Sequence, residues 1–154
     1  MAESGSHIPS HAGLLHHVEL YVSDLARSSA LWGWLLEALG YTPYQSWEAG
    51  RSWRLGHCYI VLVQTEARFL DPPYHRRRVG LNHLAFHARS RAQVDQITEE
   101  LIRRGVVVLY GDRHPYAGGT YALFFEDPDR IKIELVVDES EGDVSRGDVS
   151  WHDM

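Results

Sequence analysis

An internal near-repeat is the feature that most restricts how this chain can fold. The first copy opens with residues 15–20 (LHHVEL), and the second copy opens with residues 81–86 (LNHLAF). Both segments alternate apolar and polar side chains with a period of two, which is typical of strands. A helical pattern follows each of them. The repeat therefore predicts two modules that each begin with a strand and continue into a helix.

The two predicted helices carry ordinary start and stop signals. The first covers residues 24–39, with Asp24 as the N-cap and Gly40 as the residue that ends it. The second begins at Ser90 or Arg91, and its apolar side chains recur with a period close to 3.6 residues. Each helix therefore has one apolar face to pack against a sheet.

Strand-like runs follow each helix. They cover residues 52–55, 59–64, 106–110, 121–125 and 131–137. The order βαβββ, present twice, predicts an α+β fold with mixed rather than fully parallel sheets. We expect one folded region that consists of module one (14–68), a linker (69–79) and module two (80–137). A flexible N-terminal arm (1–13) precedes it, and an acidic flexible tail (138–154) follows it.

Composition narrows the function classes. The chain has 154 residues, a formal charge of −6 and a single cysteine, Cys58. The acidic balance argues against a nucleic acid or an anionic membrane as partner. No apolar run approaches the roughly 20 residues that span a bilayer, and one cysteine permits no internal disulfide. We therefore expect a cytoplasmic protein whose partner is neither a nucleic acid nor a membrane.

Three motifs in a fixed order resemble the vicinal oxygen chelate superfamily. They are HVELYVSDL at residues 17–25, LGY at residues 39–41 and FEDPDRIKIEL at residues 125–135. The superfamily includes glyoxalase I, bleomycin-resistance proteins, fosfomycin-resistance enzymes and extradiol dioxygenases. The resemblance implies that paired βαβββ modules form a cupped mixed sheet, with the helices outside, around one metal or ligand site. It also implies a homodimer, because many members complete the site by dimerising.

The resemblance implies a metal site as well. The family's ligands lie on the first strand of each module and on a last strand, which places them at His17, His83 and Glu134. A fourth family position aligns with Val61, where glyoxalase I has a carboxylate. The chain departs from glyoxalase I at this position.

Two imidazoles and one carboxylate can bind Fe(II), Mn(II), Ni(II), Co(II) or Zn(II) and leave coordination positions open. Such a divalent ion acts as a Lewis acid on a substrate that chelates it through two adjacent oxygens. The alternative is that both histidines only hold strand ends and that Glu134 faces water. Matched placement in a repeated unit favours the metal site.

Strand alternation adds candidates around this site. Glu19 shares a face with His17, and His87 shares a face with His83, so both are candidates for acid–base catalysis. The alternative is that they bind neighbours or solvent, for instance as a Glu19–Lys132 ion pair. Candidate substrate-binding residues are Tyr21, Trp47, Trp53, Val61 and Lys132.

Two further segments allow more than one interpretation. Residues 113–119 (RHPYAGG) have the glycine content of a mobile lid or of a long turn, and residues 76–78 (RRR) could bind an anion or form a solvated charge run.

Two functions remain open. The first is a divalent-metal-dependent enzyme, with isomerase or lyase chemistry ahead of dioxygenation and of addition to an epoxide. The second is a metal-free binding protein that sequesters a planar drug or metabolite, as bleomycin-resistance relatives do. The acidic charge and the five tryptophans suit the second, whereas three retained ligand positions favour the first.

Overall fold

The computed structural model describes residues 11–138, and the chain divides between Ala67 and Arg68 into two compact units. Most of the expected arm (1–13) and tail (138–154) therefore lies outside the described residues. None of the helices within the described range combines the length and the apolar character that crossing a bilayer requires.

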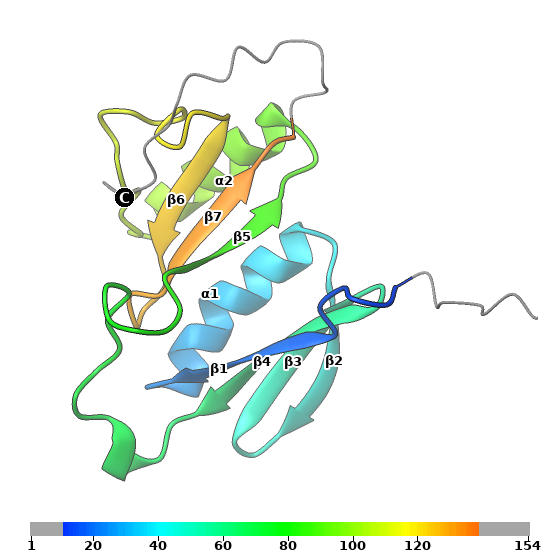
Figure 1. Ribbon diagram of the computed structural model, residues 1–154, viewed down its shortest axis with the longest axis vertical. Helices are drawn as coiled ribbons and strands as arrows, with labels where there is room; N and C mark the ends of the chain where they lie inside the picture. The colour runs from blue at the N-terminus through cyan, green and yellow to red at the C-terminus, as the bar shows by residue number, and fades with distance from the viewer. Residues whose placement is uncertain (1–10, 139–154) are drawn as a thin grey trace, which may run out of the picture. The chain divides into compact units, whose positions relative to one another are not determined.

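Unit one has the predicted order of one strand, one helix and three strands (Figure 1). The elements are β1 (His17–Val22), α1 (Leu25–Ala38), β2 (Thr42–Trp47), β3 (Gly50–Leu55) and β4 (Cys58–Gln64). The strands form one mixed sheet in the order β1-β4-β3-β2, with β1 parallel to β4 and the other pairs antiparallel. The sequence pattern predicts no strand at the position of β2. It is an exposed edge strand that contains Pro43, and edge strands tolerate proline.

The core of unit one lies between α1 and one face of this sheet. In β1, Leu20 and Val22 are buried while Glu19 and Tyr21 are exposed, so the predicted alternation is confirmed. Helix α1 begins as expected, with the Asp24 carboxylate accepting a hydrogen bond from the Arg27 amide. Trp32, Leu35 and Leu36 on the helix are fully buried, together with Leu62 of β4.

Unit two contains one strand fewer than predicted. After the short 3₁₀ helix η1 (Ala67–Phe69) come β5 (His83–His87), α2 (Arg91–Arg103), β6 (Ala122–Glu126) and β7 (Lys132–Val136). The sheet order is β5-β7-β6, with β5 parallel and β6 antiparallel to β7. The expected strand at residues 106–110 is wrong. Val108 forms a single bridge to Phe125, and the chain then turns at Tyr110, whose φ of +55° is incompatible with an extended strand.

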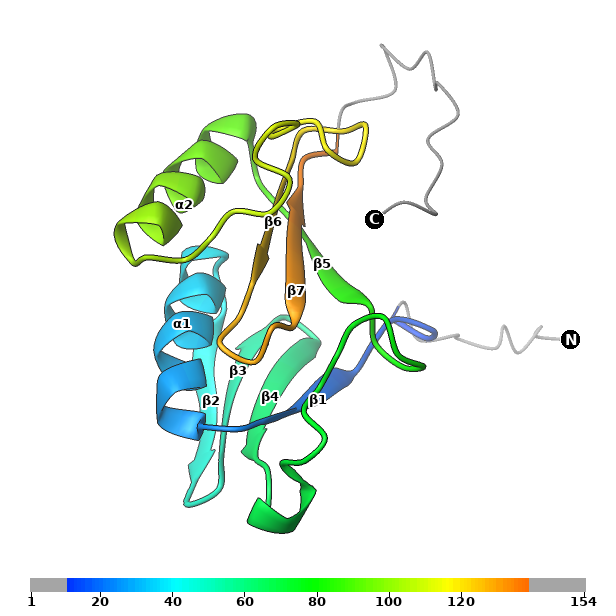
Figure 2. The same ribbon diagram turned by 90° about the vertical axis from the view of Figure 1, so that its left-hand side faces the viewer.

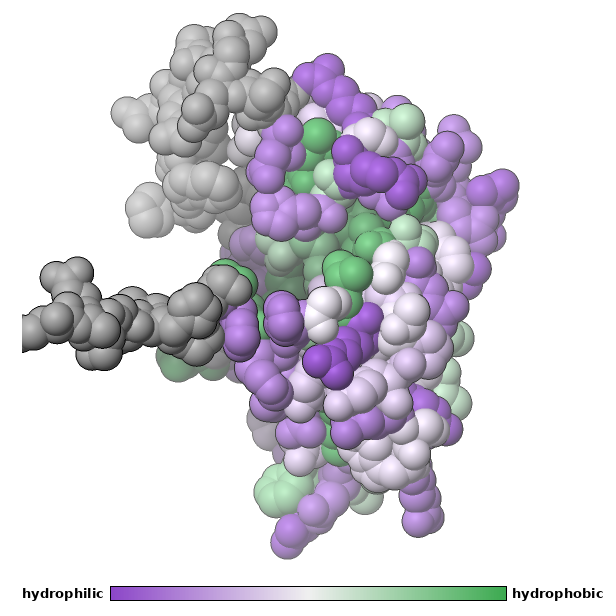
Figure 3. Space-filling view, turned by 90° about the vertical axis from the view of Figure 1, so that its right-hand side faces the viewer, coloured by the Kyte–Doolittle hydropathy of each residue, from purple (hydrophilic) through white to green (hydrophobic). Residues whose placement is uncertain are grey.

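One face of the second sheet packs under α2, as Figure 2 shows from the side. This face carries Leu123, Phe125, Ile133 and Leu135, and the helix contributes Val94 and Leu101; all six side chains are fully buried. Helix α2 begins at Arg91, one of the two predicted starting residues, and Ser90 caps it by accepting a hydrogen bond from the Gln93 amide. The opposite face of the sheet is therefore left for polar side chains. Hydrophilic residues also predominate on the molecular face drawn in Figure 3.

Candidate functional site

His83 and Glu134 meet on the polar face of the second sheet. His83 Nε2 lies 3.2 Å from Glu134 Oε2, with the His83 side chain 29% and the Glu134 side chain 10% exposed. The register explains the meeting. His83 is opposite Lys132 and Ala85 is opposite Glu134 in the parallel β5–β7 pair, so all four residues share one face. Of the predicted metal ligands, the structure thus brings these two into contact.

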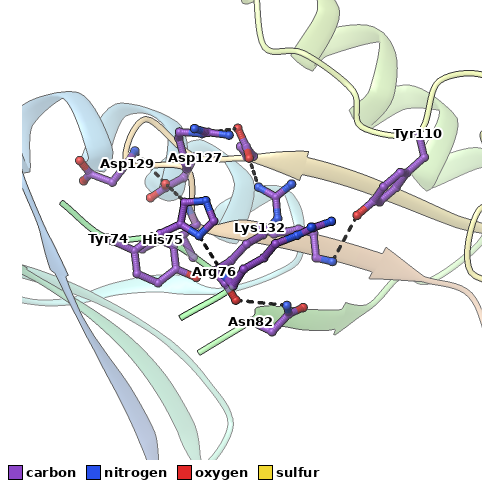
Figure 4. Close-up of polar contacts among 12 residues, drawn as sticks. Tyr74, His75, Arg76, Asn82, Tyr110, Asp127, Asp129 and Lys132 are labelled. Atoms are coloured by element: carbon purple, nitrogen blue, oxygen red, sulfur yellow. Dashed lines mark hydrogen bonds and ion pairs between the residues drawn. The ribbon is translucent and has the colours of Figure 1, made fainter. Parts of the chain in front are cut away.

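A hydrogen bond from the His83 ring to Asn82 sets the orientation of the ring. Asn82 Oδ1 lies 2.7 Å from His83 Nδ1, and Asn82 Nδ2 donates to the Arg76 carbonyl at 3.3 Å (Figure 4). Since the amide oxygen can only accept, the proton of a neutral His83 ring resides on Nδ1. The Nε2 lone pair then points at the Glu134 carboxylate, which is the donor set that a divalent cation requires.

The segment before β5 is tied to the end of β6 by an ion cluster. The Arg76 guanidinium donates to Glu126 Oε1, and Arg130 Nε lies 3.4 Å from Glu126 Oε2. Arg76 and Glu126 are each about one-fifth exposed. Arg78 donates to the Pro73 carbonyl instead. Two of the three arginines of the 76–78 run therefore hold the linker in place.

Tyr74 anchors the same linker. Its hydroxyl donates to the Leu81 carbonyl at 2.7 Å. Burial raises the pKa of Tyr74, and the neighbouring Asp127 and Glu126 carboxylates add to the rise, while the Arg76 guanidinium partly opposes it. Asp127 itself organises the turn between β6 and β7, because its Oδ1 accepts from the Asp129 and Ile131 amides, each at 2.8 Å.

Lys132 is fully buried on the polar face, beside Tyr110. Lys132 Nζ lies 3.4 Å from the Tyr110 hydroxyl and 5.7 Å from the ring centroids of Tyr110 and Phe124 (Figure 4). Phe124 is opposite Glu134 in the β6–β7 register and therefore shares its face. The residues around Gly118 fold over the same face, where a Cβ at Gly118 would stand 3.2 Å from Phe124 Cζ.

In unit one, His17 lies at the start of β1 on the face turned away from α1. Its ring stacks on Tyr59 with a centroid distance of 4.7 Å, and its Nδ1 lies 2.8 Å from His16 Nδ1. One of these nitrogens must carry the proton. If His17 donates it, the Nε2 lone pair of His17 is available to a metal. The His16 and His17 side chains are therefore joined by a hydrogen bond at the start of β1.

The other candidates on β1 share the His17 face. Glu19 and Tyr21 are exposed, and Val61 lies opposite Glu19 in the β1–β4 register but is buried. Trp47 is 42% exposed at the end of β2, and its ring covers Gly50.

Two candidates lie away from the site: Trp53 is not on a polar sheet face, and His87 is distant from the His83–Glu134 pair. Trp53 is buried against α1, where its ring contacts Gly33 and its Nε1 donates to Glu37 Oε1 at 3.4 Å. His87 ends β5 with an 81% exposed side chain that lies 2.9 Å from Asp138 Oδ2. Four residues of strand separate it from His83 by about 13 Å. We therefore leave Trp53 and His87 out of the proposed site.

Three residues at the site were not identified as functional from the sequence: Asn82, Arg76 and Tyr110. Asn82 precedes a predicted ligand directly, and this adjacency is a usable signal. Arg76 belongs to a charge run with a second plausible interpretation. No pattern in the residues near Tyr110 predicts its role, because its backbone conformation depends on the path of the whole loop 109–119.

Within either unit, over residues 11–138, no three His, Cys, Asp or Glu side chains gather into a metal-binding group. His83 and Glu134 nevertheless fit two positions of a three-ligand site by their donor chemistry and their shared face.

Each unit pairs one helix with a mixed sheet whose first and last strands are parallel, and comparison with known proteins identifies the family that has this fold. The Glyoxalase/Bleomycin resistance protein/Dioxygenase superfamily model matches residues 14–135. The chain belongs to this superfamily.

Relatives of known sequence or structure give more detail. The uncharacterized protein YqjT of Bacillus subtilis (strain 168) is 61% identical over 124 residues, which cover 79% of this chain and 97% of YqjT. Glutathione transferase FosA of Serratia marcescens is 30% identical over 123 residues, covering 80% of this chain and 79% of FosA. The crystal structure of a candidate glyoxalase from Bacillus halodurans has a TM-score of 0.82 and 55% identity, covering 83% of this chain and 98% of that one.

Proposed function

We propose that this protein is a divalent-metal-dependent enzyme acting on a small molecule with two adjacent oxygen atoms. The observation that carries the proposal is the contact between His83 Nε2 and Glu134 Oε2 at 3.2 Å. Asn82 supports it by holding the Nδ1 side of the ring, which leaves Nε2 to bind a cation. The proposed ligand set is His17, His83 and Glu134, as the sequence predicts.

The protein's own residues have separate tasks in this proposal. His83 and Glu134 hold the cation, and Asn82 fixes the imidazole ring that binds it. When bound, the ion polarises the chelated oxygens and stabilises negative charge on them. Glu19 is the proposed proton carrier, since it shares a strand face with His17 and its carboxylate is exposed.

The lead reaction is an isomerase or lyase step, in which a proton moves between neighbouring carbon or oxygen atoms of the substrate. The similarity to FosA, named as a glutathione transferase, supports a second candidate, the addition of a thiol to the substrate. A cytoplasmic location and a homodimer belong to the same proposal.

Metal analysis tests the proposal. The full-length protein, purified without chelator and loaded with Mn(II), Ni(II), Co(II) or Zn(II) in turn, is expected to retain close to one ion per chain. His17→Ala, His83→Ala and Glu134→Gln are each expected to reduce the affinity at least tenfold, since each removes one ligand. Glu134→Gln keeps the side-chain volume, so its effect reports the lost charge.

Matched controls are His57→Ala and Glu99→Gln, which change exposed residues outside the ligand set. Both should bind metal as the wild type does. A wild-type protein that retains no ion after loading, with the three ligand variants unchanged in every property, would contradict the metal-dependent enzyme. Tight binding of planar aromatic compounds by that metal-free protein would then support the alternative, a sequestering protein.

A further inference from the structure

The Lys132 ammonium is buried without a carboxylate partner. Its side chain is fully inaccessible to solvent, and within residues 11–138 its polar contact is the neutral Tyr110 hydroxyl at 3.4 Å. The faces of the Tyr110 and Phe124 rings, at 5.7 Å, add cation–π attraction. A buried charge is usually paired with an opposite charge, and these contacts compensate the lost hydration only in part.

The nearby carboxylates are already engaged. Glu134 is in contact with His83, and Glu126, which lies opposite Lys132 in the β6–β7 register, contacts Arg76 and Arg130. A second cation lies close by, because the Arg113 guanidinium sits over the Tyr110 ring at 5.2 Å. Among the described residues 11–138, no ion pair joins Lys132 or Arg113 to a carboxylate, so the region around Tyr110 carries two cations that are not paired with an anion.

The backbone at Tyr110 is held in an uncommon conformation. Its φ of +55° lies in the left-handed region, which costs a non-glycine residue free energy. The Arg113 and His114 amides both donate to the Tyr110 carbonyl, and the Leu109 amide donates to the Phe124 carbonyl, so the surrounding bonds maintain this conformation. The result is a phenol placed against Lys132. Strain of this kind gathers at ligand-binding sites.

We propose that Lys132 and Tyr110 form a subsite for an anionic oxygen group of the substrate, such as a phosphate, phosphonate or carboxylate. Lys132 supplies the charge and a hydrogen bond, and the Tyr110 hydroxyl supplies a second hydrogen bond to the same group. The subsite shares a sheet face with His83 and Glu134. It rests on the proposed function, because it names the class of substrate that the metal-binding face receives.

Anion binding to chelator-treated full-length protein tests the subsite without any metal. Inorganic phosphate and acetate, titrated separately by calorimetry at low ionic strength, serve as tetrahedral and planar probes. We expect the wild type to bind at least one of them. Lys132→Met is expected to reduce the association constant at least tenfold, and Tyr110→Phe three- to tenfold. Lys132→Arg, which keeps the charge, should retain binding better than Lys132→Met.

The matched control is Arg77→Ala, which also removes one positive charge but lies exposed in the linker. It should change anion binding less than twofold. Lys132→Met is also expected to unfold at the same or a higher temperature, since it replaces a buried charge with an apolar group of similar length. A lysine with a purely structural role would instead lower the melting temperature when replaced.

Three results would overturn the subsite: a wild type that binds neither probe, a Lys132→Met variant that binds as the wild type does, or an equal loss in Arg77→Ala. Tyr110→Phe, which removes a single oxygen, decides the matter if Lys132→Met does not fold. Failure of the metal-binding proposal is recognised separately. In that case metal is absent from the wild type while Lys132-dependent anion binding persists.

Discussion

The indole ring of Trp53 lies so close to Gly33 that a Cβ added at Gly33 would stand 2.9 Å from Trp53 Cζ2. Gly33 lies inside α1 and Trp53 in the middle of β3, so the absence of a side chain on the helix lets the sheet approach it closely. The contact fixes Trp53 in the core. Trp53, which is proposed from the sequence as a ligand contact, therefore stabilises the core instead.

Replacing Gly33 with alanine is expected to destabilise the protein by about 1 kcal/mol. Overpacking lowers the free energy of unfolding by roughly 1–3 kcal/mol, and the better helix propensity of alanine raises it by about 1 kcal/mol. Urea unfolding followed by circular dichroism measures the change. In a Trp53→Phe background, where Cζ2 of the indole is absent, the same substitution should be neutral or stabilising. An equal loss in both backgrounds would show that the clash is not the cause.

Replacing Asn82 with leucine is expected to weaken metal binding roughly 10- to 100-fold, because the His83 ring loses the partner of its Nδ1 proton. Competition with a chromophoric chelator measures the affinity. Asn82→Asp keeps an acceptor at the same place and should retain most of the affinity. If Asn82→Leu binds metal as tightly as the wild type, Asn82 does not position the ligand.

Breaking the Arg76–Glu126 pair is expected to loosen the linker. Both side chains are only about one-fifth exposed, and Arg76→Ala leaves Glu126 with Arg130 as its remaining ion-pair partner among the described residues. We expect a loss of about 1–2 kcal/mol in unfolding free energy and faster proteolysis between residues 68 and 82. Arg77→Ala, as control, should cost under about 0.5 kcal/mol. Equal proteolysis rates for wild type and Arg76→Ala would exclude a role for the pair in holding the linker.

The raised pKa of Tyr74 predicts a loss of stability in alkali. Burial is the largest cause of the rise, so the folded state favours the protonated phenol. The stabilisation is therefore complete below the ordinary tyrosine pKa of 10.0 and is lost as the pH rises through the higher folded value. Urea midpoints measured between pH 8 and pH 11 should fall less steeply for Tyr74→Phe than for the wild type. Tyr116→Phe, at an exposed position, should leave the slope unchanged.

Much of the fold could be predicted because its signals are local. The alternation in β1, the Asp24 cap and the start of the second helix at Ser90 or Arg91 each depend on a few consecutive residues, and each is confirmed by the structure. The resemblance to the vicinal oxygen chelate superfamily places two family ligands at His83 and Glu134. Their contact follows from the parallel pairing of a first and a last strand.

Features that depend on distant parts of the chain were missed or misinterpreted. Strand β2 is fully exposed and has no apolar period, so its pairing with β3 is what defines it. Residues 106–110 look like a strand by composition, yet only Val108 finds a partner before the chain turns at Tyr110.

The sequence by itself determined that each unit begins with a strand followed by a helix, that Asp24 caps the first helix, and that the first and last strands of the second unit carry His83 and Glu134. The tertiary structure alone decided that Trp53 packs against Gly33, that Asn82 orients His83 and that Tyr110 lies against the buried Lys132. The physical reason is the distance along the chain over which each interaction acts. Periodicity and capping act over one to four residues, whereas strand register and loop return set which side chains meet, and a one-residue slip in register would turn each of them to the other face.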